Sequence, residues 1–152
     1  METIEKSFEV LNDLVEINND RIAGFAHAVK DLSSNDLDLK ALFQRIREES
    51  RYNVHELGYA INSNGGETEM GMSDMGALHR AWLDVKATFT GHDRKSILVE
   101  CERGEDAIKK AYQNALSPDS GLAPEFIEIV SRQQEEVIEA HDQIKALRDS
   151  AV

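Results

Sequence analysis

The stretch IEKSFEVLNDLVEINNDRIAGFAHAVKDL, residues 4–32, decides the fold. Its apolar residues recur at alternating steps of four and three, which is the spacing that places side chains on one face of an α-helix. The members of this apolar face are Ile4, Phe8, Leu11, Val15, Ile22, Phe25, Val29 and Leu32. The pattern predicts one long amphipathic helix, and such a helix needs further elements to cover its apolar face.

Three later stretches show the same helical spacing. They run from the cap residues 33–36 to the glycines at 65–66, from Asp93 to Ser117 and Pro118, and from Pro124 to Leu147. Glycine ends a helix by adopting a left-handed conformation, and proline cannot continue one. The sequence contains no run of β-branched residues at every second position, the pattern that would indicate a strand. The sequence therefore predicts an all-α protein that folds as a single domain over residues 1–152.

The connection between the second and third long helices is unusually long. About 25 residues separate Gly66 from Gly91, whereas helix connections in bundles are commonly short. A short amphipathic helix around Trp82 lies within this segment. A helix of about 25 residues is roughly 37 Å long, and a segment of this length can run back along it. We therefore predict a crossover with a short fifth helix, which leaves the second and third long helices parallel.

Composition narrows the classes of partner. The chain has 17 Lys and Arg against 29 Asp and Glu, a formal net charge of -12, which repels nucleic acid and anionic membranes. No apolar run approaches the ~20 residues that span a bilayer, and METIEKSFEV lacks the features of a signal peptide. The single cysteine, Cys101, is expected to be a buried structural thiol. We expect a cytoplasmic protein that binds neither nucleic acid nor membrane.

Polar residues interrupt the apolar faces near the middle of each long helix. Because the middles of antiparallel helices meet at one level, we expect these side chains to form one polar layer in the core. The expected layer consists of Asn18, Ser50, Asn53, Glu105, and Gln134 with its neighbour Gln133. Glu105 would be hydrogen-bonded to Asn18, Asn53 or Gln134. Glu105→Gln would then keep these bonds, whereas Glu105→Leu would cost on the order of 1 to 3 kcal/mol.

The spacing within these helices resembles that of rubrerythrin-like proteins. Asn18 precedes Phe25 by seven residues, and Glu105 precedes Tyr112 by the same interval. In that family the corresponding positions hold metal-binding Glu residues, and the second and fourth helices each carry Glu-x-x-His. The matching positions here are Asn18, Ser50 and Asn53, Glu105, and Gln134 and Val137, with a single carboxylate among them. The resemblance implies a ferritin-like four-helix bundle that has lost its di-iron site, because amides with one carboxylate cannot offset two cations.

A longer resemblance covers residues from about Leu11 to Asp149. The segments LNDLVEINNDRIAGF, GALHRAWLDVKATFTGHDRKSILVECERGEDAIKKAYQNAL and EAHDQIKALRD are similar to the bacterial ferritin-like family catalogued as domain of unknown function 2383. This resemblance includes the crossover helix, which plain bundles lack. It implies the fold and carries no established activity.

The sequence leaves three functional hypotheses open. The first is a non-enzymatic protein without a cofactor that acts through binding or self-association. It would be a homo-oligomer, most simply a dimer, and analogy with ferritin-like proteins suggests a stress-related role. The second is an oxidoreductase or iron-handling protein that binds iron or another divalent metal through Glu49, Glu102, Glu105 and His141. The third is a small-molecule binder with a polar pocket at the middle of the bundle.

Overall fold

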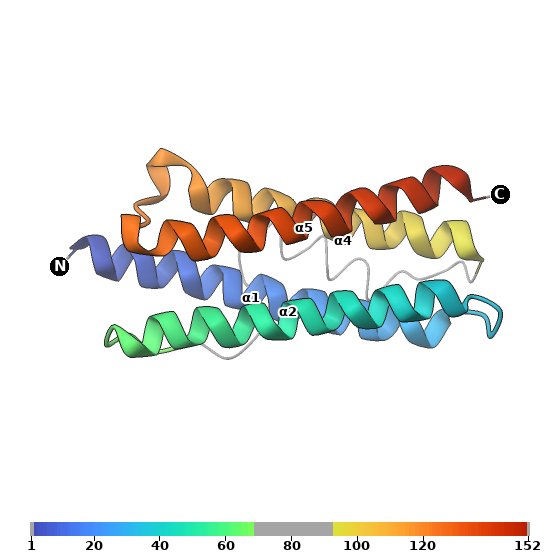
Figure 1. Ribbon diagram of the computed structural model, residues 1–152, viewed down its shortest axis with the longest axis horizontal. Coiled ribbons are helices and arrows are strands. Elements are labelled where there is room, and N and C mark those ends of the chain that lie inside the picture. Colours follow the sequence, from blue (N-terminus) through green and yellow to red (C-terminus); the bar gives the residue numbers. More distant parts are fainter. Residues whose placement is uncertain (1, 69–92, 152) are drawn as a thin grey trace.

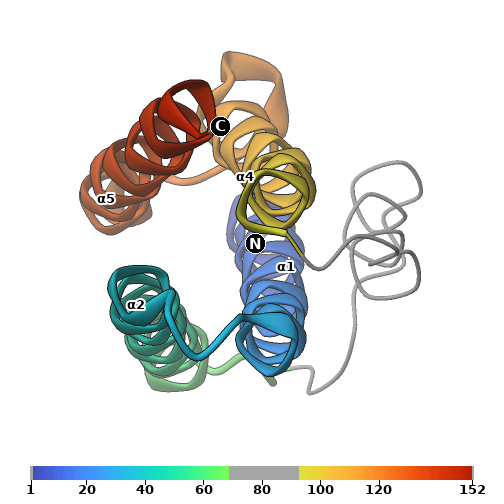
Figure 2. The same ribbon diagram turned by 90° about the vertical axis from the view of Figure 1, so that its right-hand side faces the viewer.

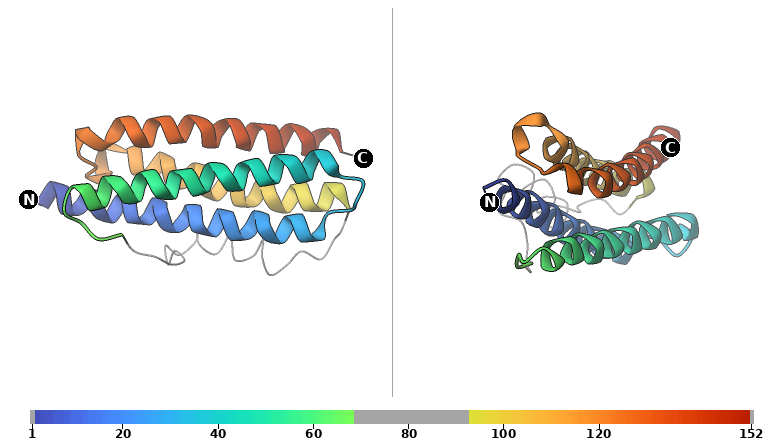
Figure 3. Two further views of the ribbon diagram at one scale, coloured as in Figure 1. Left: turned by 60° about the horizontal axis from the view of Figure 1, so that its bottom comes forward. Right: turned by 60° about the vertical axis from the view of Figure 1, so that its left-hand side comes forward.

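The computed structural model describes residues 2–68 and 93–151. Its helices are α1 (Glu2–Asp31), α2 (Leu37–Ser63), α4 (Arg94–Leu116), the short 3-10 helix η1 (Pro118–Ser120) and α5 (Pro124–Ser150). The described residues contain no strand. The all-α bundle predicted from the sequence is confirmed, and the long helices lie alongside one another (Figures 1 and 3).

Local interactions set the ends of the helices. Asp93 caps α4 by accepting a hydrogen bond from the backbone nitrogen of Ser96 at 2.8 Å. Gly65, which follows α2, has a φ of 91°, a conformation that favours glycine. Asp36 precedes α2, but its side chain makes no capping hydrogen bond and instead accepts one from Arg94. Asp36, one of the cap residues 33–36, therefore occupies the N-cap position without the side-chain hydrogen bond expected of a cap.

The direction of the helices follows from contacts between their ends. Arg94, at the start of α4, pairs with Asp36 at 3.1 Å and with Asp38 at 2.6 Å, and both acids lie at the start of α2. The two helices therefore begin at the same end of the bundle and run parallel (Figure 1). This parallel arrangement is the one predicted from the long connection. The predicted fifth helix with Trp82 lies in residues 69–92, outside the described residues.

The apolar face predicted for α1 forms much of the core. Leu11, Val15 and Phe25 are fully buried, and the ring of Phe25 meets that of Phe43 edge-on with centroids 5.1 Å apart. Leu14 and Ile17, beside the main face, are also buried within this single chain.

The four sides of the bundle are packed unequally. α1 packs closely with α2 and with α4, and α4 packs closely with α5, whereas α2 and α5 contact each other little (Figure 2). The seam between α2 and α5 is therefore the loosest side of the described bundle. None of the described helices is long and apolar enough to cross a membrane.

Candidate functional site

Six polar side chains are almost completely buried in the middle of the bundle. Each is at most 1% exposed, and they are Asn18, Arg21, Ser50, Asn53, Glu105 and Gln133; the neighbouring Asp20 of α1 is also fully buried. Five of them, all except Arg21, belong to the layer expected from the sequence. Gln134 is only half-buried, and its neighbour Gln133 takes the core position on α5. Arg21 is the member that sequence reasoning missed.

Arg21 lies on α1, three residues after Asn18 and therefore on the same side of the helix. Its Nε and Nη2 donate to the two carboxylate oxygens of Glu105 on α4, each at 2.8 Å. Its Nη1 donates to Glu49 Oε2 at 2.7 Å and to Ser50 Oγ at 3.1 Å, both on α2. Arg21, Glu49 and Glu105 thus form a charged triad that links three helices. The forked pairing with Glu105 uses the geometry in which guanidinium and carboxylate groups fit best.

The triad explains how a guanidinium is tolerated in the core. Burial by itself lowers the pKa of Arg21, but the charges and hydrogen bonds of Glu105 and Glu49 outweigh burial and raise that pKa. Arg21 therefore stays charged. Burial also raises the pKa of Glu49 above its usual value of 4.5, and the hydrogen bond and charge of Arg21 oppose this only in part. The carboxylates of Glu105 and Glu136 raise the pKa of Glu49 further.

A chain of neutral hydrogen bonds lies next to the triad. Asn53 Nδ2 donates to Asn18 Oδ1 at 3.3 Å, and Asn18 Nδ2 donates to the hydroxyl of Tyr112 at 3.0 Å. The Tyr112 hydroxyl donates to Gln133 Oε1 at 2.7 Å, and Gln133 Nε2 donates to Glu56 Oε1 at 2.9 Å. Burial raises the pKa of Tyr112, so its hydroxyl keeps the proton that this chain requires.

These contacts revise the environment expected for Glu105. Both of its carboxylate oxygens accept hydrogen bonds from Arg21 rather than from the amides of Asn18, Asn53 or Gln134. Asn18 and Asn53 bond to each other, and Asn18 and Gln133 bond to Tyr112. The polar layer therefore has an ionic part and a neutral part.

The residues of this layer do not fit the di-iron centre that the rubrerythrin-like resemblance implies. Asn18, Ser50 and Asn53 supply no negative charge, and the carboxylates of Glu49 and Glu105 already neutralise a protein cation. A divalent metal at this level would have to displace a buried guanidinium held by four hydrogen bonds.

The alternative metal-ligand set is divided between two places. Glu49 and Glu105 hold Arg21, whereas Glu102 and His141 lie together between α4 and α5. Glu102, His141 and the exposed Asp106 offer ligand atoms within 4.8 Å of one another. Each is already engaged, since His141 Nε2 lies 2.6 Å from Asp106 Oδ1 and Glu102 pairs with Arg148. The four ligands named from the sequence do not converge on one point.

The thiol of Cys101 is buried on the same face of α4 as Glu105. Burial raises its pKa well above the usual value, and the charges of Glu105 and Glu100 add to the increase. A thiol held protonated at neutral pH is a poor nucleophile. This agrees with the structural role expected for it from the sequence.

A cavity of about 560 Å³ lies at the seam between α2 and α5, to one side of the triad. Arg45, Glu48, Glu49 and Tyr52 of α2 and Glu136 and Glu139 of α5 contribute to its walls. The side chain of Glu49 is 20% exposed, so it touches both this cavity and buried Arg21. This cavity lies on the α2–α5 side, whereas the third hypothesis from the sequence expected a polar pocket at the middle of the bundle.

Comparison with known proteins gives a family but no activity. No curated protein matches this sequence. The model of a family described as domain of unknown function (DUF2383) matches residues 6–118, which run from α1 into η1 and make up more than half of the chain. This is the family that the sequence resembles, although α5 lies beyond the matched range. The chain belongs to the DUF2383 family.

Proposed function

We propose that this protein is a ferritin-like bundle that works without a di-iron centre, as a binding or self-association protein rather than an enzyme. One observation carries the proposal, namely that the fully buried guanidinium of Arg21 lies between Glu49 and Glu105. The cation that a carboxylate layer needs is supplied by the chain itself.

The chemistry of the triad supports a structural role for the layer. Arg21 and Glu105 are fully buried and fully occupied with each other, so neither is positioned to meet a substrate. Removing one partner of a buried ion pair is strongly destabilising because it leaves an uncompensated charge. The triad therefore holds α1, α2 and α4 in a fixed register. The residues that bind a partner would then lie on the surface of the bundle.

A strongly acidic exterior favours association with a partner of opposite charge. We place the protein in the cytoplasm, where a buried unpaired cysteine stays reduced, and a stress-related role follows from ferritin-like analogy. A homodimer is the simplest form of self-association.

Iron binding tests the proposal directly. Untagged protein should contain no stoichiometric iron by plasma mass spectrometry. Anaerobic titration with iron(II) followed by oxygen should produce no absorbance change. Near-stoichiometric iron with an oxygen-dependent absorbance change would overturn the proposal.

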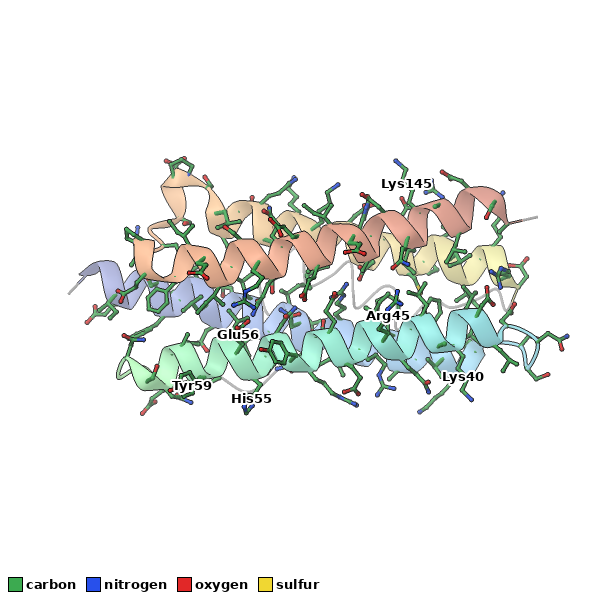
Figure 4. All side chains as sticks on the ribbon, viewed as in Figure 1. Lys40, Arg45, His55, Glu56, Tyr59 and Lys145 are labelled. Atoms are coloured by element: carbon green, nitrogen blue, oxygen red, sulfur yellow. The ribbon has the colours of Figure 1, made fainter. Side chains whose placement is uncertain are left out.

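The second candidate, an iron-handling protein, draws on the cluster of Glu102, Asp106 and His141. A matched pair of variants locates any iron that is found. His141→Ala removes a member of the cluster, and His55→Ala removes an exposed histidine of α2 outside it (Figure 4). Iron uptake that His141→Ala abolishes and His55→Ala preserves would establish this second function.

A further inference from the structure

The seam between α2 and α5 contains two depressions of different chemistry. The first is the cavity of about 560 Å³ beside the triad, and the second has a volume of about 260 Å³ further along the seam. The ribbons of α2 and α5 lie apart (Figure 2), and the weak packing between these two helices leaves both depressions open to solvent. Arg45 and Glu56 project from α2 toward α5, on the seam side of the helix (Figure 4).

The first depression is acidic. Glu48, Glu49, Glu136 and Glu139 contribute to its walls, against the single cationic side chain of Arg45. Arg21 pairs with Glu49 and Arg51 pairs with Glu48, which leaves Glu136 and Glu139 as the acidic side chains of this depression without an ion pair among the described residues. Burial is the main cause of the raised pKa of Glu49, and the charges of Glu105 and Glu136 add to the increase. The depression is therefore complementary to a cationic group.

The second depression is more apolar. Tyr59, Phe126 and Ile129 contribute to its walls, and the side chain of Tyr59 is 72% exposed. An ion pair of 2.8 Å between Glu56 and Arg132 bridges the two helices beside it. An aromatic and aliphatic depression of this kind suits a single apolar side chain as an anchor.

The spacing of the two depressions suits a helix. Glu49 and Ala60 contribute to the first and second depressions, respectively. Their separation of eleven residues on α2 corresponds to about 16 Å, or about three helical turns. A ligand helix lying along the seam would present basic side chains and an apolar side chain at that interval.

A second copy of this chain fits the seam less well than a basic partner. It would bring a net charge of -12 and, if it docked by the same surface, the same carboxylates. Like charges that meet at an interface oppose association.

We propose that the α2–α5 seam binds a basic amphipathic helix of a protein partner. Lysine or arginine side chains enter the acidic depression, and an aromatic or aliphatic side chain about three turns away enters the apolar one. The inference rests on the proposed function as a binding protein, and it names the surface and the class of partner.

A labelled peptide tests this inference. The probe is a fluorescein-labelled, end-capped helical peptide of about 20 residues with three lysines at one end and a phenylalanine about eleven residues away. Its fluorescence anisotropy is measured against the full-length protein. We expect saturable binding that weakens from about 50 to about 300 mM salt, since the contacts are partly electrostatic. A peptide with glutamate in place of lysine should not bind.

Variants place the binding on the seam. Glu136→Gln with Glu139→Gln should weaken binding by about tenfold, and Tyr59→Ser should weaken it with less change in salt dependence. The matched control is Glu128→Gln with Glu135→Gln, which removes the same charge from exposed positions of α5 that line neither depression. This control should bind within about twofold of the unmodified protein, because its charges lie outside the binding surface.

Three results would overturn the inference. They are the absence of saturation up to about 1 mM peptide, equal binding of the lysine and glutamate peptides, and equal effects of the seam and control variants. A protein that dimerises alone, by light scattering, and loses the dimer with Glu136→Gln and Glu139→Gln would assign the seam to a second copy instead. Iron analysis of the same samples tests the proposed function separately. Iron uptake would overturn the proposed function, whereas the results above would overturn only the binding of a basic helix at the seam.

Discussion

At the scale of single residues, Arg21 determines the chemistry of the core. A lone guanidinium would not be stable there, because removing a charge from water costs several kcal/mol unless partners compensate. Glu105 compensates with two hydrogen bonds, and Glu49 and Ser50 supply two more. The cost of disturbing this group therefore depends on which partner is removed.

Arg21→Met should reduce the free energy of unfolding by about 3 to 5 kcal/mol, because two carboxylates lose their counter-ion in the core. The loss should shrink as the pH falls, since unpaired buried carboxylates take up protons. Urea unfolding followed by circular dichroism measures both effects. The control Arg45→Met removes an exposed arginine of α2 and should stay within about 0.5 kcal/mol. A loss below about 1 kcal/mol for Arg21→Met would show that the triad is not buried.

Glu105→Gln distinguishes an ionic partner from an amide network. A layer of amides would accept the substitution without loss, whereas Arg21 needs a charge and a two-oxygen acceptor. We expect a loss on the order of 3 kcal/mol, close to that of Glu105→Leu. Equal stability of Glu105→Gln and the unmodified protein in urea would contradict the pairing with Arg21.

At the scale of elements, the ends of α2 and α4 are tied together by charge. Arg94 joins Asp36 and Asp38, and its hydrogen bond lowers the pKa of Asp38 from 3.8 to about 2. These contacts help to set the parallel direction of the two helices. They lie near the surface, so solvent screens them more than it screens the buried triad.

The tie between Arg94 and Asp38 predicts a dependence of stability on pH. Because folding lowers the pKa of Asp38, the stabilisation is present above pH 3.8 and is lost as the pH falls toward about 2. Asp38→Asn should remove this loss and cost no more than about 1 kcal/mol at neutral pH, because the pair is exposed. Thermal unfolding between these pH values tests it, with Glu128→Gln as an exposed control. A pH profile unchanged by Asp38→Asn would contradict the tie.

At the scale of the whole molecule, excess negative charge opposes the compact state. The net charge is -12, and carboxylates gather along the loosest side of the bundle. The protein therefore keeps an acidic surface at some cost in stability, which is consistent with a surface that serves binding.

The free protein should gain stability when the seam loses charge. Glu136→Gln with Glu139→Gln should raise the free energy of unfolding by about 0.5 to 1 kcal/mol, because fewer carboxylates repel one another. Added salt should stabilise the unmodified protein more than this variant. Calorimetry at about 50 and about 500 mM salt measures the difference. A variant less stable than the unmodified protein at low salt would show that these two residues stabilise the bundle rather than strain it.

Much of the fold follows from the sequence, because its signals are local. Helical periodicity, the cap at Asp93 and the stop at Gly65 act within a few residues of one another. The length of the connection after Gly66 also predicted the parallel run of α2 and α4, because a chain must span the distance between two helix ends. The burial of Asn18 and Glu105 likewise follows from their place on apolar faces.

The charged triad could be recognised only from the packed helices. Ile22 lies four residues after Asn18 and Arg21 lies three residues after it, so either residue could share the helical face of Asn18. A charged residue is normally exposed to solvent, and the sequence therefore favours Ile22 for the buried position. Arg21 is buried because Glu49 and Glu105, 28 and 84 residues away, reach it from two other helices. Gln133 and Gln134 point about 100° apart on α5, and packing against the other helices sets which one is buried. A sequence read one helix at a time contains no information on such pairings, because their energy arises only when the helices meet.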